Sequence, residues 1–151
     1  MKIGIISDTH GLLRQEVLDT LAGCTYILHG GDINRQEIID HLETIAPVYV
    51  VRGNNDKEWA ESIPAFLDLE VEGIRIYMTH KKKDLPEDLT PYDLVVVGHT
   101  HKYAHTQMGN TLIINPGSCG PRKIDQAITM AIADIYGGNI KVTAIDIPHK
   151  R

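Results

Sequence analysis

The sequence predicts an α/β fold, a four-layer sandwich in which two central mixed β-sheets are flanked by helices. The first third of the chain alternates short apolar β-branched runs with segments of helical spacing. This β-α-β-α-β order predicts right-handed crossovers and a parallel sheet. The second half contains three pairs of apolar runs joined by short glycine-containing turns, which are typical of hairpins. Because no repeat, low-complexity segment or linker interrupts the 151 residues, we expect a single domain over 1–151.

Three short runs of the first third are predicted strands, because they are apolar, rich in β-branched residues and followed by polar or glycine residues. They are residues 3–7, 26–29 and 48–52. The segment 12–22 has apolar residues at positions 13, 17, 18 and 21, which is helical spacing. Gly23 follows it, as glycine commonly does just past a helix end.

A second helix is predicted between residues 34 and 47. Asn34 is expected to be its N-cap, because Glu37 lies three residues later in a capping-box arrangement. Positions 38, 39, 42 and 45 form its apolar face, and Pro47 ends it. In parallel sheets of this kind, binding sites collect at the carboxyl ends of the strands.

The second half is predicted to contain mainly strands. Residues 94–98 form a fully apolar, β-branched run, which is typical of a strand buried on both faces. Trp59 and residues 84–92 are expected in loops or short helices. The predicted hairpins pair 66–70 with 74–79, 106–108 with 111–114, and 130–135 with 140–145.

Composition excludes several classes of protein. The formal net charge of −5 and the pI near 5.9 argue against a protein built to bind a nucleic-acid backbone. Two cysteines, Cys24 and Cys119, are too few for a disulfide framework and fit a reducing compartment. No apolar run reaches the ~18 residues of a membrane span, and none resembles a signal peptide. A cytoplasmic protein is therefore expected.

The strongest functional signal is a recurrence at the ends of the predicted strands. The strand at 94–98 is followed by two histidines at i and i+2, and burying such imidazoles without partners would be costly. Four other strands also end in groups that can bind metals. The candidate metal ligands are Asp8, His10, Asp32, Asn54, His80, His99 and His101.

Any one of these residues alone would usually be a cap, a turn residue or a solvated side chain. Five separate strand ends that each carry a ligand type are better explained by a metal site. His29 and His105 lie near these motifs, but a hydrogen-bonded supporting or surface role is the simpler interpretation. His41 and His149 are expected to have no role in the site.

Two carboxylates, one amide oxygen and four imidazoles suit a borderline or hard divalent ion. We expect Mn²⁺ first, with Ni²⁺, Fe²⁺, Zn²⁺ and Co²⁺ as alternatives. Seven ligands exceed what one ion would use, so two ions are predicted, with Asp32 as the natural bridge. Such a pair lowers the pKa of a bridging water and holds both the attacking and the departing oxygen of a displacement.

These blocks resemble, in order, the signature motifs of the calcineurin-like metallophosphoesterase superfamily. The matching stretches are 8–10, 31–32, 53–56, 79–80 and 98–101, and they cover nearly the whole chain. The short length and the block Asn115-Pro116-Gly117-Ser118 are most similar to its small prokaryotic phosphodiesterase branch. The resemblance implies a metallo-dependent phosphatase-like sandwich, a small phosphoester substrate, and in this branch often a dimer or larger homo-oligomer.

The resemblance also implies a division of the ligands. One metal would be held by Asp8, His10, Asp32 and His101, and the other by Asp32, Asn54, His80 and His99. Many family members have a histidine that protonates the leaving group where this chain has Asn55. An amide has no useful pKa, so Asn55 cannot be a general acid, and activated esters should be the better substrates.

The candidate catalytic residues are Asn54, Asn55 and Asp56, with Asp56 expected to orient Asn55 or to brace the turn. Lys81 stands where the family usually has glycine, and it either contacts substrate phosphate or extends into solvent. Arg122 is a weak electrostatic candidate whose simpler interpretation is a surface role. For Cys119 a packed thiol is the simpler interpretation.

The function expected from these residues is a divalent-metal-dependent phosphodiesterase that uses a metal-bridging hydroxide. One alternative is a metal-binding but non-catalytic protein-interaction scaffold, the role of a retromer subunit that resembles these enzymes. The other is a phosphomonoesterase or nucleotidase. The natural substrate and the native metal remain open at this point.

Overall fold

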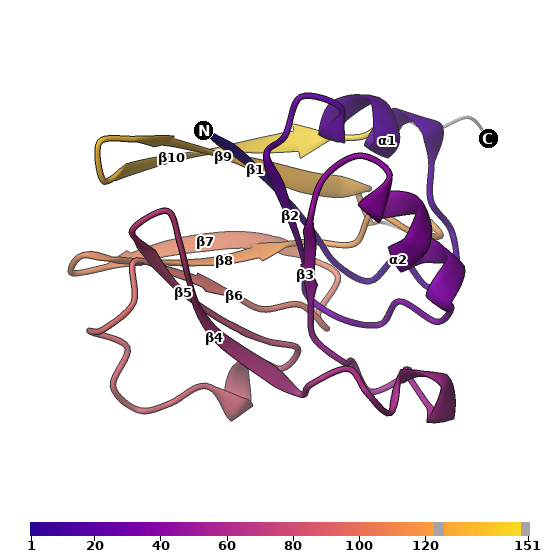
Figure 1. Ribbon diagram of the computed structural model, residues 1–151, viewed down its shortest axis with the longest axis horizontal. Coiled ribbons are helices and arrows are strands. Elements are labelled where there is room, and N and C mark those ends of the chain that lie inside the picture. Colours follow the sequence, from indigo (N-terminus) through magenta and orange to yellow (C-terminus); the bar gives the residue numbers. More distant parts are fainter. Residues whose placement is uncertain (123–125, 149–151) are drawn as a thin grey trace.

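The computed structural model describes residues 1–122 and 126–148 and places their strands in two five-stranded sheets (Figure 1). In order across the first sheet lie β10 (Asn139–Asp146), β9 (Thr129–Tyr136), β1 (Lys2–Ile6), β2 (Tyr26–His29) and β3 (Val48–Val50). In order across the second sheet lie β4 (Phe66–Val71), β5 (Ile74–Thr79), β6 (Leu94–Val96), β8 (Thr111–Pro116) and β7 (Tyr103–Met108).

Both sheets are mixed, as the sequence predicts. In the first sheet β1, β2 and β3 are parallel, and β9 pairs antiparallel with β1. In the second sheet β5, β6 and β8 are parallel, while β4 and β7 are antiparallel edge strands. The three predicted hairpins are confirmed, as β4–β5, β7–β8 and β9–β10.

The two sheets pack face to face across one apolar core. Ile3 and Ile5 of β1 point into this core and meet Met78 and Val96 of the second sheet, whereas Ile6 faces the other side. This alternation follows from the period of two along a strand. It explains why β1 is apolar and buried from Ile3 to Ile6.

Two short helices cover the outer face of the first sheet (Figure 1). They are α1 (Gln15–Leu21) and α2 (Gln36–Glu43), and they bury residues such as Val17, Leu21 and Leu42. The outer layer of the second sheet is thinner. There a small cluster of Tyr77, Tyr92, Val95 and Ile113 packs with the loop before β6. The two-sheet sandwich is therefore confirmed, and among the described residues the α-helices lie on one of its two outer faces.

The expected cap of the second helix is wrong. The residue before α2 is Arg35, no side chain caps the helix, and Asn34 has a φ of 76°. The Asn34 N–H donates instead to Asp56 Oδ1 at 2.8 Å. A contact from 22 residues away replaces the local capping box, which sequence spacing cannot reveal.

The remaining predicted segments differ only in their bounds. The first helix begins at Gln15, later than predicted, and Trp59 lies in a short 3₁₀ turn, η1 (Glu58–Ala60). A second such turn, η2 (Lys82–Asp84), follows β5. His149 lies outside the described residues. Across residues 1–122 and 126–148, no helix combines the length and the apolarity needed to span a membrane.

Candidate metal centre

All seven predicted ligands lie in loops that leave the carboxyl ends of parallel strands. Asp8 and His10 follow β1, Asp32 follows β2, and Asn54 follows β3. In the second sheet, His80 follows β5, and both His99 and His101 follow β6. Because parallel strands end at the same edge, each sheet brings its ligands to one rim. The packing of the two sheets then joins the two rims.

One cluster contains Asp8, His10 and His101. His101 Nε2 lies 3.3 Å from Asp8 Oδ1, and His10 Nε2 lies 3.7 Å from the same oxygen. The two imidazole nitrogens face each other at 3.2 Å. Asp8 and His101 are buried and His10 is partly buried, so these donors converge away from bulk solvent.

The second cluster contains Asp32, His80 and His99, with Asn54 beside it. His80 Nε2 lies 3.2 Å from Asp32 Oδ2, and its Nδ1 contacts the Gly30 carbonyl at 2.7 Å. His99 Nδ1 lies 3.1 Å from Asn54 Oδ1. The Gly30 carbonyl accepts the Nδ1 proton, so His80 Nε2 keeps its lone pair towards the cluster.

Asp32 lies between the two clusters. Its Oδ2 is 3.2 Å from His80 Nε2 and 3.7 Å from His10 Nε2. The clusters also approach each other directly, because His80 Nε2 lies 3.9 Å from Asp8 Oδ1. The two ligand groups are therefore adjacent parts of one continuous site, and Asp32 and Asp8 each approach a histidine of the other group.

Three buried polar atoms of this site have no hydrogen-bond partner within the described part of the chain. They are Asp8 Oδ1, His80 Nε2 and His101 Nδ1. Leaving such atoms unpaired costs about 1–3 kcal/mol each. Asp8 Oδ1 and His80 Nε2 belong to a mixed oxygen and nitrogen donor set that divalent ions prefer. The residues present therefore fit a divalent metal cofactor.

The Asp8 and Asp32 carboxylates and the imidazoles around them shift one another's pKa values. Burial alone would raise the pKa of Asp8, but the neighbouring imidazoles of His10 and His101 outweigh burial and hold that pKa well below its usual range. Burial opposes the charging of His80, yet Asp32 and the Gly30 carbonyl outweigh it and raise the pKa of His80. Burial likewise opposes ionisation of Asp32, but His80 and the Asn55 backbone N–H together outweigh it, so the pKa of Asp32 is lowered.

The backbone of the ligand loops is strained. Five of the seven candidate ligands have positive φ angles, which non-glycine residues rarely adopt and which cost roughly 1–3 kcal/mol each. The angles are 56° at Asp8, 46° at His10, 58° at Asp32, 77° at His99 and 64° at His101. The surrounding structure holds these residues in backbone conformations that are locally unfavourable but direct their side chains into the site.

Two glycines allow the ligand loops to approach one another. A Cβ on Gly53 would collide with the backbone nitrogen and the carboxylate of Asp32. Gly31 has a φ of 104°, and a Cβ there would lie 2.7 Å from His80 Nδ1. Both positions therefore need a residue without a Cβ.

Asp56 braces two of the ligand loops. Its Oδ2 accepts the N–H groups of Asp32 and Gly53 at 2.9 Å each. Its Oδ1 accepts those of Ile33 at 2.9 Å and Asn34 at 2.8 Å. Both carboxylate oxygens are thus engaged by backbone, so of the two roles expected for Asp56 the bracing one matches its contacts.

Asn55 lies against the central carboxylate. Its backbone N–H donates to Asp32 Oδ1 at 2.8 Å, and its side-chain Nδ2 donates to Asp32 Oδ2 at 3.2 Å. These two bonds fix the Asp32 carboxylate. An amide at this position can hold Asp32, but its N–H protons are not acidic enough to be transferred to a departing oxygen.

Sequence reasoning missed part of the supporting shell. Ser7 Oγ donates to Asp8 Oδ2 at 2.7 Å, and Ser118 Oγ donates to the Asp8 carbonyl at 3.0 Å. His29, for which a hydrogen-bonded supporting or surface role was expected, is fully buried. It accepts the Gly31 N–H at Nδ1 (3.1 Å) and lies 3.0 Å from Thr9 Oγ1 through Nε2. Burial lowers the pKa of His29 from 6.5 to about 4, so it is neutral and supports two ligand loops. The serine within the 115–118 block was the available signal.

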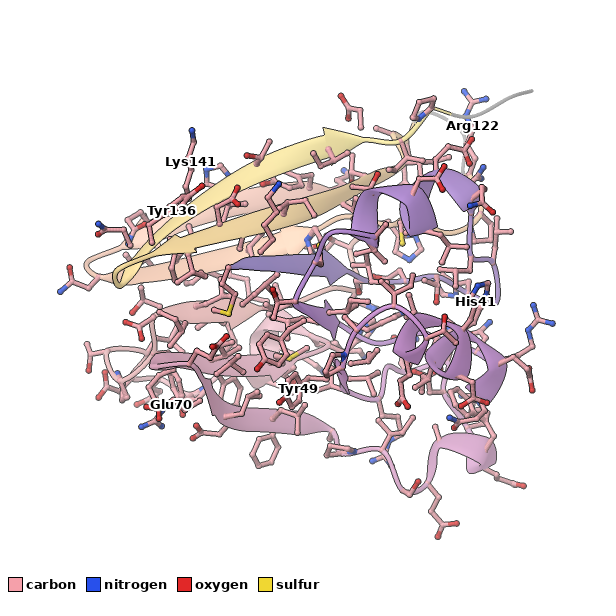
Figure 2. All side chains as sticks on the ribbon, turned by 45° about the horizontal axis from the view of Figure 1, so that its top comes forward. His41, Tyr49, Glu70, Arg122, Tyr136 and Lys141 are labelled. Atoms are coloured by element: carbon pink, nitrogen blue, oxygen red, sulfur yellow. The ribbon has the colours of Figure 1, made fainter. Side chains whose placement is uncertain are left out.

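The structure also places the residues whose roles the sequence did not decide. Cys119 is fully buried against Ser7, and burial raises the pKa of its thiol to about 12, as expected of a packed thiol. Arg122 is exposed, and Figure 2 shows its side chain extending outward from the molecule. His41 lies exposed on α2 in the same view. Lys81 lines a cavity next to His80.

The comparisons with known proteins agree with this geometry. The family model described as "Calcineurin-like phosphoesterase superfamily domain" matches residues 1–138. A protein of Methanothermobacter thermautotrophicus named "Probable metallophosphoesterase" is 30% identical over 149 residues, which cover 89% of this chain and 87% of the relative.

Two further similarities involve proteins named as phosphodiesterases. Phosphodiesterase MJ0936 of Methanocaldococcus jannaschii is 29% identical over 146 residues, covering 79% of this chain and 84% of the relative. A solved structure described as "Structural and Functional Characterization of a Novel Archaeal Phosphodiesterase" has a TM-score of 0.80 and 26% sequence identity. It covers 96% of this chain and 100% of its own.

Proposed function

The chain belongs to the calcineurin-like phosphoesterase superfamily, and from this premise we propose that it is a divalent-metal-dependent phosphodiesterase with a two-metal centre. The observation that carries the proposal is the convergence of two ligand clusters on Asp32, whose Oδ2 lies within 3.7 Å of an imidazole nitrogen from each. Relatives named as phosphodiesterases support the diester as the substrate class.

The ligand geometry supports a division into two metal positions. Asp8, His10 and His101 would hold one ion, His80, His99 and Asn54 would hold the other, and Asp32 would contact both. When bound, a pair of divalent ions supplies Lewis acidity that polarises phosphoryl oxygens and lowers the pKa of water. Mn²⁺ is the first candidate, because oxygen and imidazole donors without thiolate suit it.

The protein's own residues position this chemistry. Asp56 holds the Asp32 and Asn54 loops through four backbone hydrogen bonds, and Asn55 fixes the Asp32 carboxylate. Asn54 is exposed, so its side-chain amide is also available to a substrate phosphate. Because no general acid lies at position 55, leaving groups that need no proton should react best.

The test uses bis-p-nitrophenyl phosphate with metal-free protein, with and without added Mn²⁺. We expect turnover only with metal. Asp8→Asn and His80→Gln should each lower kcat/KM by about 100-fold or more, since both remove a ligand that touches the catalytic ion. Asp146→Asn, an exposed change on β10, is the matched control and should leave turnover intact.

Two other results would change the assignment. Tight metal binding without turnover of any phosphoester would favour the non-catalytic scaffold. Faster hydrolysis of p-nitrophenyl phosphate than of the diester would favour a phosphomonoesterase. We further propose a single domain and a cytoplasmic location, which the two buried free thiols support because disulfides are rare in that compartment.

A further inference from the structure

A cavity of about 320 Å³ opens directly beside the second ligand cluster. Asn54 and His80 line it, and further lining residues come from the start of β4 and the turn η2 after β5. Small-molecule sites in proteins typically measure about 300–1,000 Å³. The cavity therefore has room for a substrate group next to the reacting phosphate.

One side of the cavity is a flat aromatic surface. Phe66 stacks on Tyr77 with ring centroids 5.7 Å apart and an interplanar angle of 13°. Tyr77 is buried, whereas Phe66, the only phenylalanine of the chain, remains 54% exposed. A large apolar ring left half exposed at a cavity wall is unfavourable in water but is a good platform for a planar ligand.

The lining of the cavity is also basic. Arg52, Lys81 and Lys83 all line it, against one carboxylate, Asp84. Within the described residues none of these three cations has a carboxylate partner within 4 Å, since the only Lys or Arg ion pair there joins Arg75 to Asp68. This excess of positive charge occurs in a chain whose net charge is −5. Cations that face a cavity without partners are suited to binding an anion.

We propose that this cavity binds one ester group of the diester substrate and selects a group that has both a planar ring and a further negative charge. A nucleotide that carries a second phosphate has this chemistry: its base stacks on Phe66, and its second phosphate lies among Arg52, Lys81 and Lys83. The inference rests on the proposed phosphodiesterase function and adds the substrate class to it.

The test compares three p-nitrophenyl phosphodiesters that share one leaving group. Their second ester groups are methyl, thymidine through its 5′-oxygen, and the same thymidine with a 3′-phosphate. With Mn²⁺ present, we expect KM to fall about 5-fold from methyl to thymidine because of stacking. It should fall about 10-fold more with the 3′-phosphate, because charged hydrogen bonds are added.

Variants assign each preference to its side chain. Phe66→Ala should remove most of the advantage of thymidine over methyl. Lys81→Gln and Lys83→Gln should each reduce the advantage of the 3′-phosphate by about 3-fold or more. Lys82→Gln is the matched control, because Lys82 lies in the same turn and has the same charge but does not line the cavity. It should leave both ratios unchanged.

The outcomes separate the two proposals. Equal KM values for the three esters, or an equal loss in the Lys82→Gln variant, would overturn the inference while the phosphodiesterase function stands. No turnover of any ester would instead remove the proposed function. In that case, calorimetry with thymidine 3′,5′-bisphosphate and metal-free protein tests the cavity. Binding that is weakened by Lys81→Gln but not by Lys82→Gln would support a nucleotide site. Absence of binding would overturn the inference.

Discussion

The carboxylate of Asp56 holds the backbone of Asp32 across 24 residues of sequence. Asp56 Oδ2 accepts the Asp32 N–H at 2.9 Å, and the same oxygen accepts the N–H of Gly53, in the loop after β3. Asp32 has a φ of 58°, a conformation that needs outside support. One buried charge thus keeps the central ligand and a neighbouring ligand loop in register.

We predict that Asp56→Asn weakens both folding and activity. An asparagine turns an NH₂ group towards N–H donors and leaves at least one of them unpaired. The expected loss in the free energy of unfolding is about 2–4 kcal/mol. Urea unfolding measures it, with Asp146→Asn as the exposed control. A loss equal to that of the control would show that the brace is dispensable.

Gly53→Ala should disrupt the site more than its small size suggests. The new Cβ meets the backbone nitrogen of Asp32, which cannot rotate away. Overpacking of this kind costs about 1–3 kcal/mol, and displacement of Asp32 should lower kcat by about 100-fold. Gly23→Ala is the matched control, because a Cβ there meets nothing within 4 Å and its φ is not positive. Unchanged diester hydrolysis by Gly53→Ala would contradict this geometry.

Asn55→His should broaden the range of leaving groups. An imidazole at this position supplies a titratable proton, which typically contributes about 10²–10⁴-fold where the leaving oxygen must be protonated. We expect the rates on alkyl diesters to rise relative to those on p-nitrophenyl diesters, by about 10-fold or more. The dependence of kcat on leaving-group pKa measures this change. If that dependence is as steep in the variant as in the natural chain, the leaving group is not limited by the missing acid.

Stability should fall on mild acidification because of His29. Burial lowers the pKa of this imidazole from 6.5 to about 4, so the folded chain stays neutral while the unfolded chain takes up a proton. The stability that this group contributes is complete above about pH 6.5 and decreases as the pH falls. Between about pH 7 and pH 5 the free energy of unfolding should drop by about 2 kcal/mol.

Urea unfolding at those two pH values, in the natural chain and in His29→Gln, isolates this contribution. The glutamine variant should lose most of the pH dependence that His29 causes. His41→Gln, an exposed change on α2 that is visible in Figure 2, should keep the dependence of the natural chain. Identical slopes in all three proteins would exclude His29 as the source.

Much of this molecule was predictable from local patterns. The strands were predictable from apolar β-branched runs, and the three hairpins from glycine-containing turns. Both elements are determined largely by residues that are close together in the sequence. The seven candidate ligands were found because each lies just after a parallel strand. Within each sheet these ligands lie close together because parallel strands end at the same edge. The cap at Asn34 was predicted wrongly because a distant carboxylate competes with local capping.

What the sequence determined by itself is the order of strands and helices, the family resemblance, and a donor set of two carboxylates, an amide and four imidazoles. Only the tertiary structure decided the distances between these donors, that Asp56 accepts four backbone N–H groups, and that Phe66 and three cations line one cavity. The physical reason is that these relationships join atoms from different strands and both sheets. Their distances are set by how the two sheets pack, and spacing along the chain carries no record of that packing.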